Sequence, residues 1–296
     1  HCWGSGANGR LGTGEQISQL VPYRVTYSNA QVVSDTLKIT AGSENTIYSI
    51  RRDDGVLVAS GFGRNWGRVL TDIGSTTHLL WPTFIGALPA IQSLSAGHAH
   101  ACGHRADGRV FCWGRSADSG RGGVSVEWAD LKTLDALGAV QQIDAGRDHT
   151  CAVKEGAVIC WGGPGHQRLG VLGGVRGSNN GTHGSSSFLP TVLPDGRQAV
   201  QVAAGTHHSC ARLDNQSVYC WGRNQYGQIG NGESSVYSSG DVVVGLDGVH
   251  HLAAGPRHNC AIRGDQTVWC WGWNIRNQTG DGFVLIYDSP QRLPGF

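Results

Sequence analysis

The sequence predicts an all-β protein whose sheets stack radially, as in a β-propeller. Glycine supplies 46 of the 296 residues, whereas only 15% of residues are charged, below the usual quarter. A pattern of roughly 50 residues recurs along the chain. Its short apolar runs are bounded by glycine, aspartate and asparagine, which are strand and hairpin signals. A single unit of this size cannot bury both faces of its sheet, so the units are expected to stack around an axis.

The composition argues against several other classes of protein. With 39% hydrophobic residues the chain can bury a core, and its three lysines are too few for a typical helical bundle. The net charge of +1 argues against a nucleic-acid partner, because duplex binding usually needs a strong basic patch. No stretch approaches 18 apolar residues, so no membrane span is expected. The chain begins at His1 without an initiator methionine, which is typical of a processed or trimmed chain.

Each repeat starts at an Ala-Gly pair, continues through a histidine and a cysteine, and reaches a Cys-Trp-Gly motif. The Ala-Gly pairs lie 55, 49, 59 and 50 residues apart. A second signature follows Trp-Gly and is clearest over residues 224–232, Asn-Gln-Tyr-Gly-Gln-Ile-Gly-Asn-Gly. The pairs begin at Ala41, Ala96, Ala145, Ala204 and Ala254.

The units follow one another without a break, so one propeller domain is predicted over residues 1–296. A partial unit over 1–36 precedes units at about 37–90, 91–139, 140–198, 199–248 and 249–296. In unit 199–248, strands are expected over 198–204, 209–213 and 217–221. Unit 37–90 is degenerate. There we place Ile47 and Ala59 in the two cysteine positions, Asn45 in the histidine position, and Ser60-Gly61 in the Trp-Gly position.

These motifs resemble the regulator-of-chromosome-condensation repeat family over essentially the whole chain. The resemblance implies four-stranded antiparallel blades, about six here, in a ring normally closed by strands from both termini. One blade would then be incomplete in this chain. The family includes nuclear exchange factors for a small GTPase and bacterial secreted proteins, among them a β-lactamase inhibitor. The doubled cysteines look like the secreted branch, and they conflict with a nuclear exchange factor.

Eight of the nine cysteines form four pairs with a hairpin turn between their members. Such residues face one another on adjacent strands, close enough for a disulfide. Reduced structural cysteines and metal ligation are the alternatives, although Cys-x₂-Cys spacing is absent. Disulfides would indicate an oxidising compartment, so a secreted, extracellular, periplasmic or cell-surface protein is expected. The predicted pairs are Cys102–Cys112, Cys151–Cys160, Cys210–Cys220 and Cys260–Cys270.

The odd cysteine, Cys2, stands just before Trp3-Gly4, where the second cysteine of a pair belongs. Its partner would lie about eight residues before His1, by the spacing of the other pairs. The simpler interpretation is that an N-terminal segment has been trimmed or is not included in the given sequence. The alternative is an open seam that takes a strand from another chain, which would allow self-assembly.

No catalytic constellation, cofactor motif or metal site is predicted. The repeated histidines more plausibly make structural hydrogen bonds between strands than ligate a metal; they are His100, His149, His208 and His258. Non-repeating tryptophans are candidates for a binding face, with core packing as the alternative: Trp66, Trp81, Trp128 and Trp273. Three sequons are candidate glycosylation sites: Asn180, Asn215 and Asn277.

We therefore expect an extracellular, non-enzymatic protein-binding or assembly module that uses propeller loops or the open seam. A secreted lectin or enzyme inhibitor is the first alternative, with a protein or a glycan as partner. An enzyme with a loop-built active site is the alternative of another class.

Overall fold

The computed structural model shows an all-β chain with short 3₁₀ turns at Ala7–Gly9, Asp135–Leu137 and Pro194–Gly196. All strand pairings are antiparallel among the residues described. The structure describes residues 1–4, 6–33, 36–42, 47–53, 56–65, 70, 78–87, 91–114, 132–163, 167–170, 188, 190–275, 277, 279 and 281–294.

Each sheet is built from one continuous stretch of chain, as expected for the blades of a propeller. The first two sheets contain β1 (Cys2–Gly4) and β2 (Gln19–Tyr23), then β3 (Thr36–Ala41), β4 (Ile47–Asp53), β5 (Val56–Arg64) and β6 (His78–Ala87). The next two contain β7 (Ile91–Ala96), β8 (His100–Arg105), β9 (Val110–Gly114) and β10 (Lys132–Thr133), then β11 (Gln142–Ala145), β12 (His149–Lys154) and β13 (Ala157–Gly162). The last two contain β14 (Ala199–Ala204), β15 (His208–Leu213), β16 (Val218–Arg223) and β17 (Tyr237–Val242), then β18 (Val249–Ala254), β19 (His258–Arg263), β20 (Val268–Trp273) and β21 (Ile286–Arg292).

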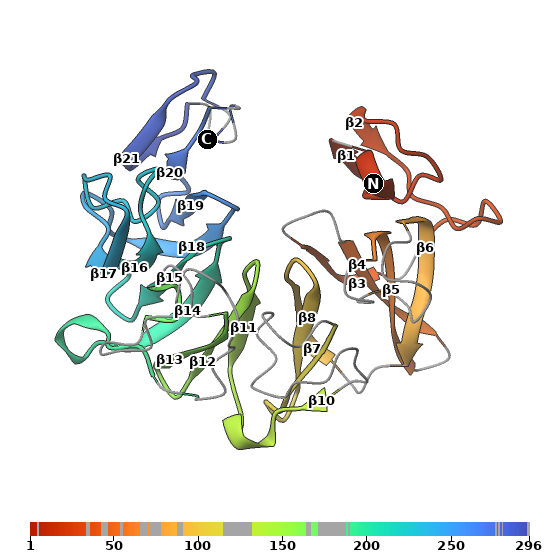
Figure 1. Ribbon diagram of the computed structural model, residues 1–296, viewed down its shortest axis with the longest axis horizontal. Helices are drawn as coiled ribbons and strands as arrows, with labels where there is room; N and C mark the ends of the chain where they lie inside the picture. The colour runs from red at the N-terminus through yellow and green to blue at the C-terminus, as the bar shows by residue number, and fades with distance from the viewer. Residues whose placement is uncertain are drawn as a thin grey trace.

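The first strands of successive sheets, β3, β7, β11, β14 and β18, lie next to one another, and the blades are arranged around them (Figure 1). The ring is not closed: β1 and β2 pair only with each other, across a gap from β18–β21. No sheet in the described part of the chain combines strands from both termini, which differs from the expected closure. Instead, β21 is the fourth strand of the sheet β18–β21, and β1 pairs with β2.

The register in the degenerate unit corrects one prediction. The Trp-Gly glycines of the four disulfide-containing units have a positive φ, for example 108° at Gly222, and each follows its cysteine by two residues. In this unit the matching glycine is Gly63, with φ 106°, so Phe62 and not Ser60 takes the tryptophan position. The residues in the cysteine positions are then Gly61 and its cross-strand partner Tyr48, not Ala59 and Ile47. Asn45 lies outside the described residues.

The hydrophobic core lies between the blades, where the disulfide of one blade packs with the tryptophan of the next. Cys210 and Cys220 share a buried cluster with Trp271, which is 0% exposed. The tryptophan edge also rests on a glycine: a Cβ on Gly230, φ 75°, would lie 2.8 Å from Trp271 Nε1. Phe62 occupies the same place against Gly12, which supports its assignment to the tryptophan position. Trp161 and Trp221 pack in the same way, each in a buried cluster with the cysteines of the preceding blade.

Side chains, rather than a β-ladder, join the first strands of neighbouring blades. The Gln142 amide donates to Val202 O (3.1 Å) and accepts from Val202 N (2.7 Å). Gln201 does the same with Leu252, at 2.8 Å and 3.1 Å. Asp144 accepts from Ser95 Oγ on one side (2.7 Å) and from Ala204 N on the other (2.8 Å). These bonds satisfy backbone groups that the splayed strands leave unpaired.

Candidate functional site

The structure forms the four disulfides that the hairpin spacing predicts. In each hairpin the two cysteines are direct cross-strand partners, with Cα atoms 4.0–4.1 Å apart: Cys102–Cys112, Cys151–Cys160, Cys210–Cys220 and Cys260–Cys270. Cys2 is free and half-buried, and its burial raises the pKa of the thiol. It lies on β1, where β1 pairs only with β2.

The repeated histidines join one blade to the next. Nε2 of three of the four lies 2.8–2.9 Å from a polar atom on the second strand of the following blade: His100 to Thr150 Oγ1, His149 to Ser209 Oγ, and His208 to Asn259 Oδ1. Ser209 Oγ donates its own proton to a backbone carbonyl, so His149 Nε2 carries the proton in that pair. Burial lowers the pKa of His149 well below 6.5 and that of His208 to about 4. These are neutral structural groups, as the sequence indicated.

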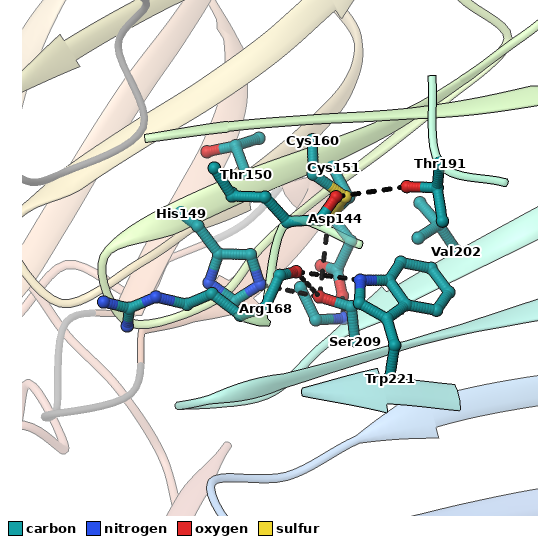
Figure 2. The surroundings of a disulfide bond; sticks show 12 residues. Asp144, His149, Thr150, Cys151, Cys160, Arg168, Thr191, Val202, Ser209 and Trp221 are labelled. Carbon is teal, nitrogen blue, oxygen red and sulfur yellow. Dashed lines mark hydrogen bonds between the residues drawn. A yellow bond between two sulfur atoms is a disulfide. The ribbon is translucent and has the colours of Figure 1, made fainter. Parts of the chain in front are cut away.

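In two blades, a backbone carbonyl in the loop after the third strand accepts hydrogen bonds from side chains of the next blade. Arg168 O accepts from Trp221 Nε1 (2.9 Å) and from Ser209 Oγ (3.0 Å) beside the Cys151–Cys160 disulfide (Figure 2). The Arg168 side chain is also buried, and its Nη1 lies 3.2 Å from Asp148 Oδ2. One blade later Gln228 O accepts from Trp271 Nε1 (2.9 Å) and Asn259 Nδ2 (2.7 Å). The side chains that repeat are thus used to hold the blades together.

The asparagine that opens the second signature shapes the following loop. Asn224 Oδ1 accepts from Ile229 N (2.9 Å), and Asn274 Oδ1 accepts from Thr279 N (2.9 Å). Both asparagines are fully buried, and their Nδ2 groups hold the far side of the same loop by donating to Glu233 O and Phe283 O (3.0 Å each). Each asparagine side chain thus joins two sides of its loop.

Loops at one end of the propeller form a surface that we call the loop face. It consists of the loops between first and second strands, such as 255–257, and between third and fourth strands, such as 224–236 and 274–285. Here Arg257 Cζ lies 5.3 Å from the ring centroid of Tyr226 and 5.0 Å from that of Trp273. Arg223 Cζ lies 5.7 Å from the Tyr226 ring, and the two rings are 6.1 Å apart. We call these four half-buried side chains the arginine–aromatic cluster.

The predicted binding-face tryptophans do not gather in one place. Trp273 belongs to the arginine–aromatic cluster, whereas Trp81 is half-buried on β6 and packs against Gly14, where a Cβ would lie 2.1 Å from its ring. Trp66 and Trp128 lie outside the described residues. Sequence reasoning missed the other members of the cluster. The available signal was that Arg257 takes a position that is Asp148 and His207 in the two preceding units.

The described sequons lie in exposed turns. Asn215 is in the β15–β16 hairpin, where its Oδ1 accepts from Ser217 Oγ (2.8 Å). Asn277, with φ 54°, accepts from Gly282 N (3.0 Å). Asn180 lies outside the described residues, and glycosylation at all three stays a prediction. Among the residues that the structure describes, no group of three metal-ligating side chains is found, and no helix is long and apolar enough to cross a membrane.

Together these contacts define a class of protein: a repeat propeller with a disulfide inside each of four blades and variable loops on one end. Sequence comparison places the chain within this class. Two family models match, and both are described as regulator of chromosome condensation (RCC1) repeat. One matches residues 1–48 and 215–262, and the other matches residues 91–120, 199–228 and 249–278. The chain belongs to the RCC1 repeat family, whose propellers mediate protein interactions or regulation.

The chain is 28% identical over 239 residues to the ultraviolet-B receptor UVR8 of Arabidopsis thaliana, covering 78% of this chain and 50% of that protein. It is 30% identical over 264 residues to the human E3 ubiquitin-protein ligase HERC2, covering 83% of this chain and 5% of that one. It thus spans half or less of these curated relatives.

Solved structures show the same fold. Yeast RCC1 (Prp20) bound to Kap60 matches with TM-score 0.75 and 18% identity over 98% of this chain and 70% of that one. Human WBSCR16 matches with TM-score 0.71 and 20% identity, over 95% and 71%.

Proposed function

We propose that this chain is an extracellular, non-enzymatic protein-binding module that docks its partner on the loop face. One observation carries the proposal: repeating side chains hold the blades together, whereas side chains that differ between units gather on the loop face. His208 and Trp221 illustrate the first group, and Arg257 and Trp273 the second. Aromatic and arginine side chains held on a rigid scaffold are typical anchors of protein interfaces.

The four disulfides support the extracellular setting, because such bonds persist mainly in oxidising compartments. The test is a thiol count on the protein isolated from its source under immediate alkylation. Only Cys2 should react before reduction. Nine reactive cysteines would refute the extracellular part of the proposal.

Site-specific photo-cross-linking tests the binding part. A benzophenone side chain would replace exposed Gln225 on the loop face or exposed Asp214 in the hairpin at the opposite end. Illumination in the native extracellular fluid should yield a discrete cross-linked protein from position 225 and none from position 214. Equal cross-linking from both positions, or from position 214 alone, would refute docking on the loop face. A glycan array and a hydrolase substrate panel test the lectin and enzyme alternatives on the same protein.

A further inference from the structure

We propose that the arginine–aromatic cluster binds an acidic segment of a protein partner in which apolar side chains flank the carboxylates. This inference rests on the proposed function and names the chemistry of the partner. Its starting point is the arrangement of charge at the cluster. Arg223 and Arg257 approach the same Tyr226 ring, at 5.7 Å and 5.3 Å from its centroid.

These two guanidinium groups form no ion pair within the described part of the chain. Arg223 donates to the neutral amide oxygen of Gln225, and Arg257 contacts only the faces of two rings. Elsewhere arginines have carboxylate partners: Arg168 lies 3.2 Å from Asp148, and Arg263 is paired with Asp247. Two like charges held beside one ring with no counter-charge favour an external anion.

The ring contacts fix the guanidinium planes without using all their donors. Arginine presents donors in a planar fork that matches a carboxylate, and stacking on aromatic faces orients this fork in advance. The hydrogen bonds of Asn224 and Asn274 hold the loops that carry Tyr226 and follow Trp273. The cluster is therefore ready to accept a carboxylate with little reorganisation.

Exposed apolar side chains border the cluster on the adjoining strands and loops. Ile286 is the cross-strand partner of Trp273 and is 46% exposed, and Tyr237 is the partner of Arg223. Val236, which precedes Tyr237, is 61% exposed, and Leu285, which precedes Ile286, is 52% exposed. A patch of this kind beside uncompensated arginines fits a segment that alternates acidic and apolar residues.

The size of the charged site favours a protein over other polyanions. Two arginines are fewer than the several phosphate contacts that give nucleic acids their affinity. They are also fewer than the four to eight basic residues of typical anionic-membrane sites. A short peptide with one or two carboxylates and neighbouring leucine or phenylalanine side chains matches both parts of the surface.

The test selects random 12-residue peptides on phage against the complete 296-residue chain. Selected peptides should be enriched in Asp and Glu together with Leu, Phe or Trp. For a synthetic peptide from this set, Arg257→Gln should weaken binding roughly tenfold to hundredfold, as expected when a charged hydrogen bond is lost. Arg257→Lys should weaken it less, and added salt should weaken wild-type binding.

Arg109→Gln is the matched control, because Arg109 is exposed in the β8–β9 hairpin at the other end of its blade. It should bind the peptide like wild type. Thermal melts of all variants would show that each is folded. Peptides without acidic enrichment, or equal binding by Arg257→Gln, would overturn the inference while leaving the proposed binding function intact. If no peptide binds at all, the inference fails, whereas the proposed binding function is still decided by the cross-linking experiment.

Direct assays test two other occupants of the cluster, a second copy of this chain and a membrane surface. Sedimentation velocity would show whether wild type self-associates while Arg257→Gln stays monomeric, which would assign the cluster to a second copy. Co-sedimentation with phosphatidylserine vesicles, lost in Arg257→Gln, would assign it to a membrane surface. Either result would overturn the assignment to an acidic protein segment.

Discussion

Acidification should destabilise the propeller through its buried histidines, and His208 sets the scale of the effect. Burial lowers the pKa of His208 from 6.5 to about 4, so the folded chain keeps this ring neutral. The unfolded chain takes up a proton between pH 6.5 and pH 4 that the folded chain does not. The full contribution to stability is therefore present above pH 6.5 and is lost as the pH falls. At pH 5 the loss of unfolding free energy from this group is about 2 kcal/mol, because one pKa unit corresponds to 1.36 kcal/mol.

The assay is urea unfolding at pH 7.5 and pH 5.0 with the disulfides intact. His208→Gln removes the titrating group, and the glutamine amide can still donate to Asn259 Oδ1. The loss of unfolding free energy between the two pH values should be smaller by about 2 kcal/mol in His208→Gln than in wild type. His251→Gln, at an exposed position on β18, is the control and should follow wild type. An equal loss in His208→Gln and wild type would refute the reasoning.

Two further predictions concern the blade interfaces. Gly230→Ala and Gly232→Ala both place a side chain at positive φ, which costs about 1–2 kcal/mol, but only the first meets Trp271. In urea unfolding, Gly230→Ala should therefore lower the free energy of unfolding by roughly 1–3 kcal/mol more than Gly232→Ala does. Equal losses in the two variants would contradict the packing described. In the 296-residue chain, limited reduction should open Cys260–Cys270 first, because Cys260 is half-buried whereas the other three disulfides are fully buried. Differential alkylation and mass spectrometry would show this, and earlier labelling of any other pair would contradict it.

The fold could be predicted because its determinants are local and repeated. The cysteine pairs lie 9 or 10 residues apart across one hairpin, so their spacing alone places them opposite one another. The degenerate unit shows the limit of this approach. Its β5 contains two closely spaced pairs that end in glycine, Ser60-Gly61 and Phe62-Gly63, and only the backbone angle at Gly63 and the contact of Phe62 with Gly12 distinguish them.

The contacts between blades could not be predicted. Gln142 and Gln201 reach backbone groups 60 and 51 residues away, and nothing in their local sequence indicates this. The arginine–aromatic cluster combines residues from two loops of one blade and one loop of its neighbour. Trp273 was found because aromatic side chains off the repeat are conspicuous. Arg223 and Arg257 were missed because their significance depends on the absence of an acidic neighbour in space.

The glutamine bridges between first strands also bear on how such a chain can change in length. At two junctions a glutamine side chain recognises only the main chain of the next blade, as Gln201 does at Leu252. Main-chain groups are the same in every unit, so a duplicated or deleted unit meets a compatible neighbour at once. Gene duplication can therefore add or remove blades without new complementary side chains at that junction, while the loops of each copy are free to diverge.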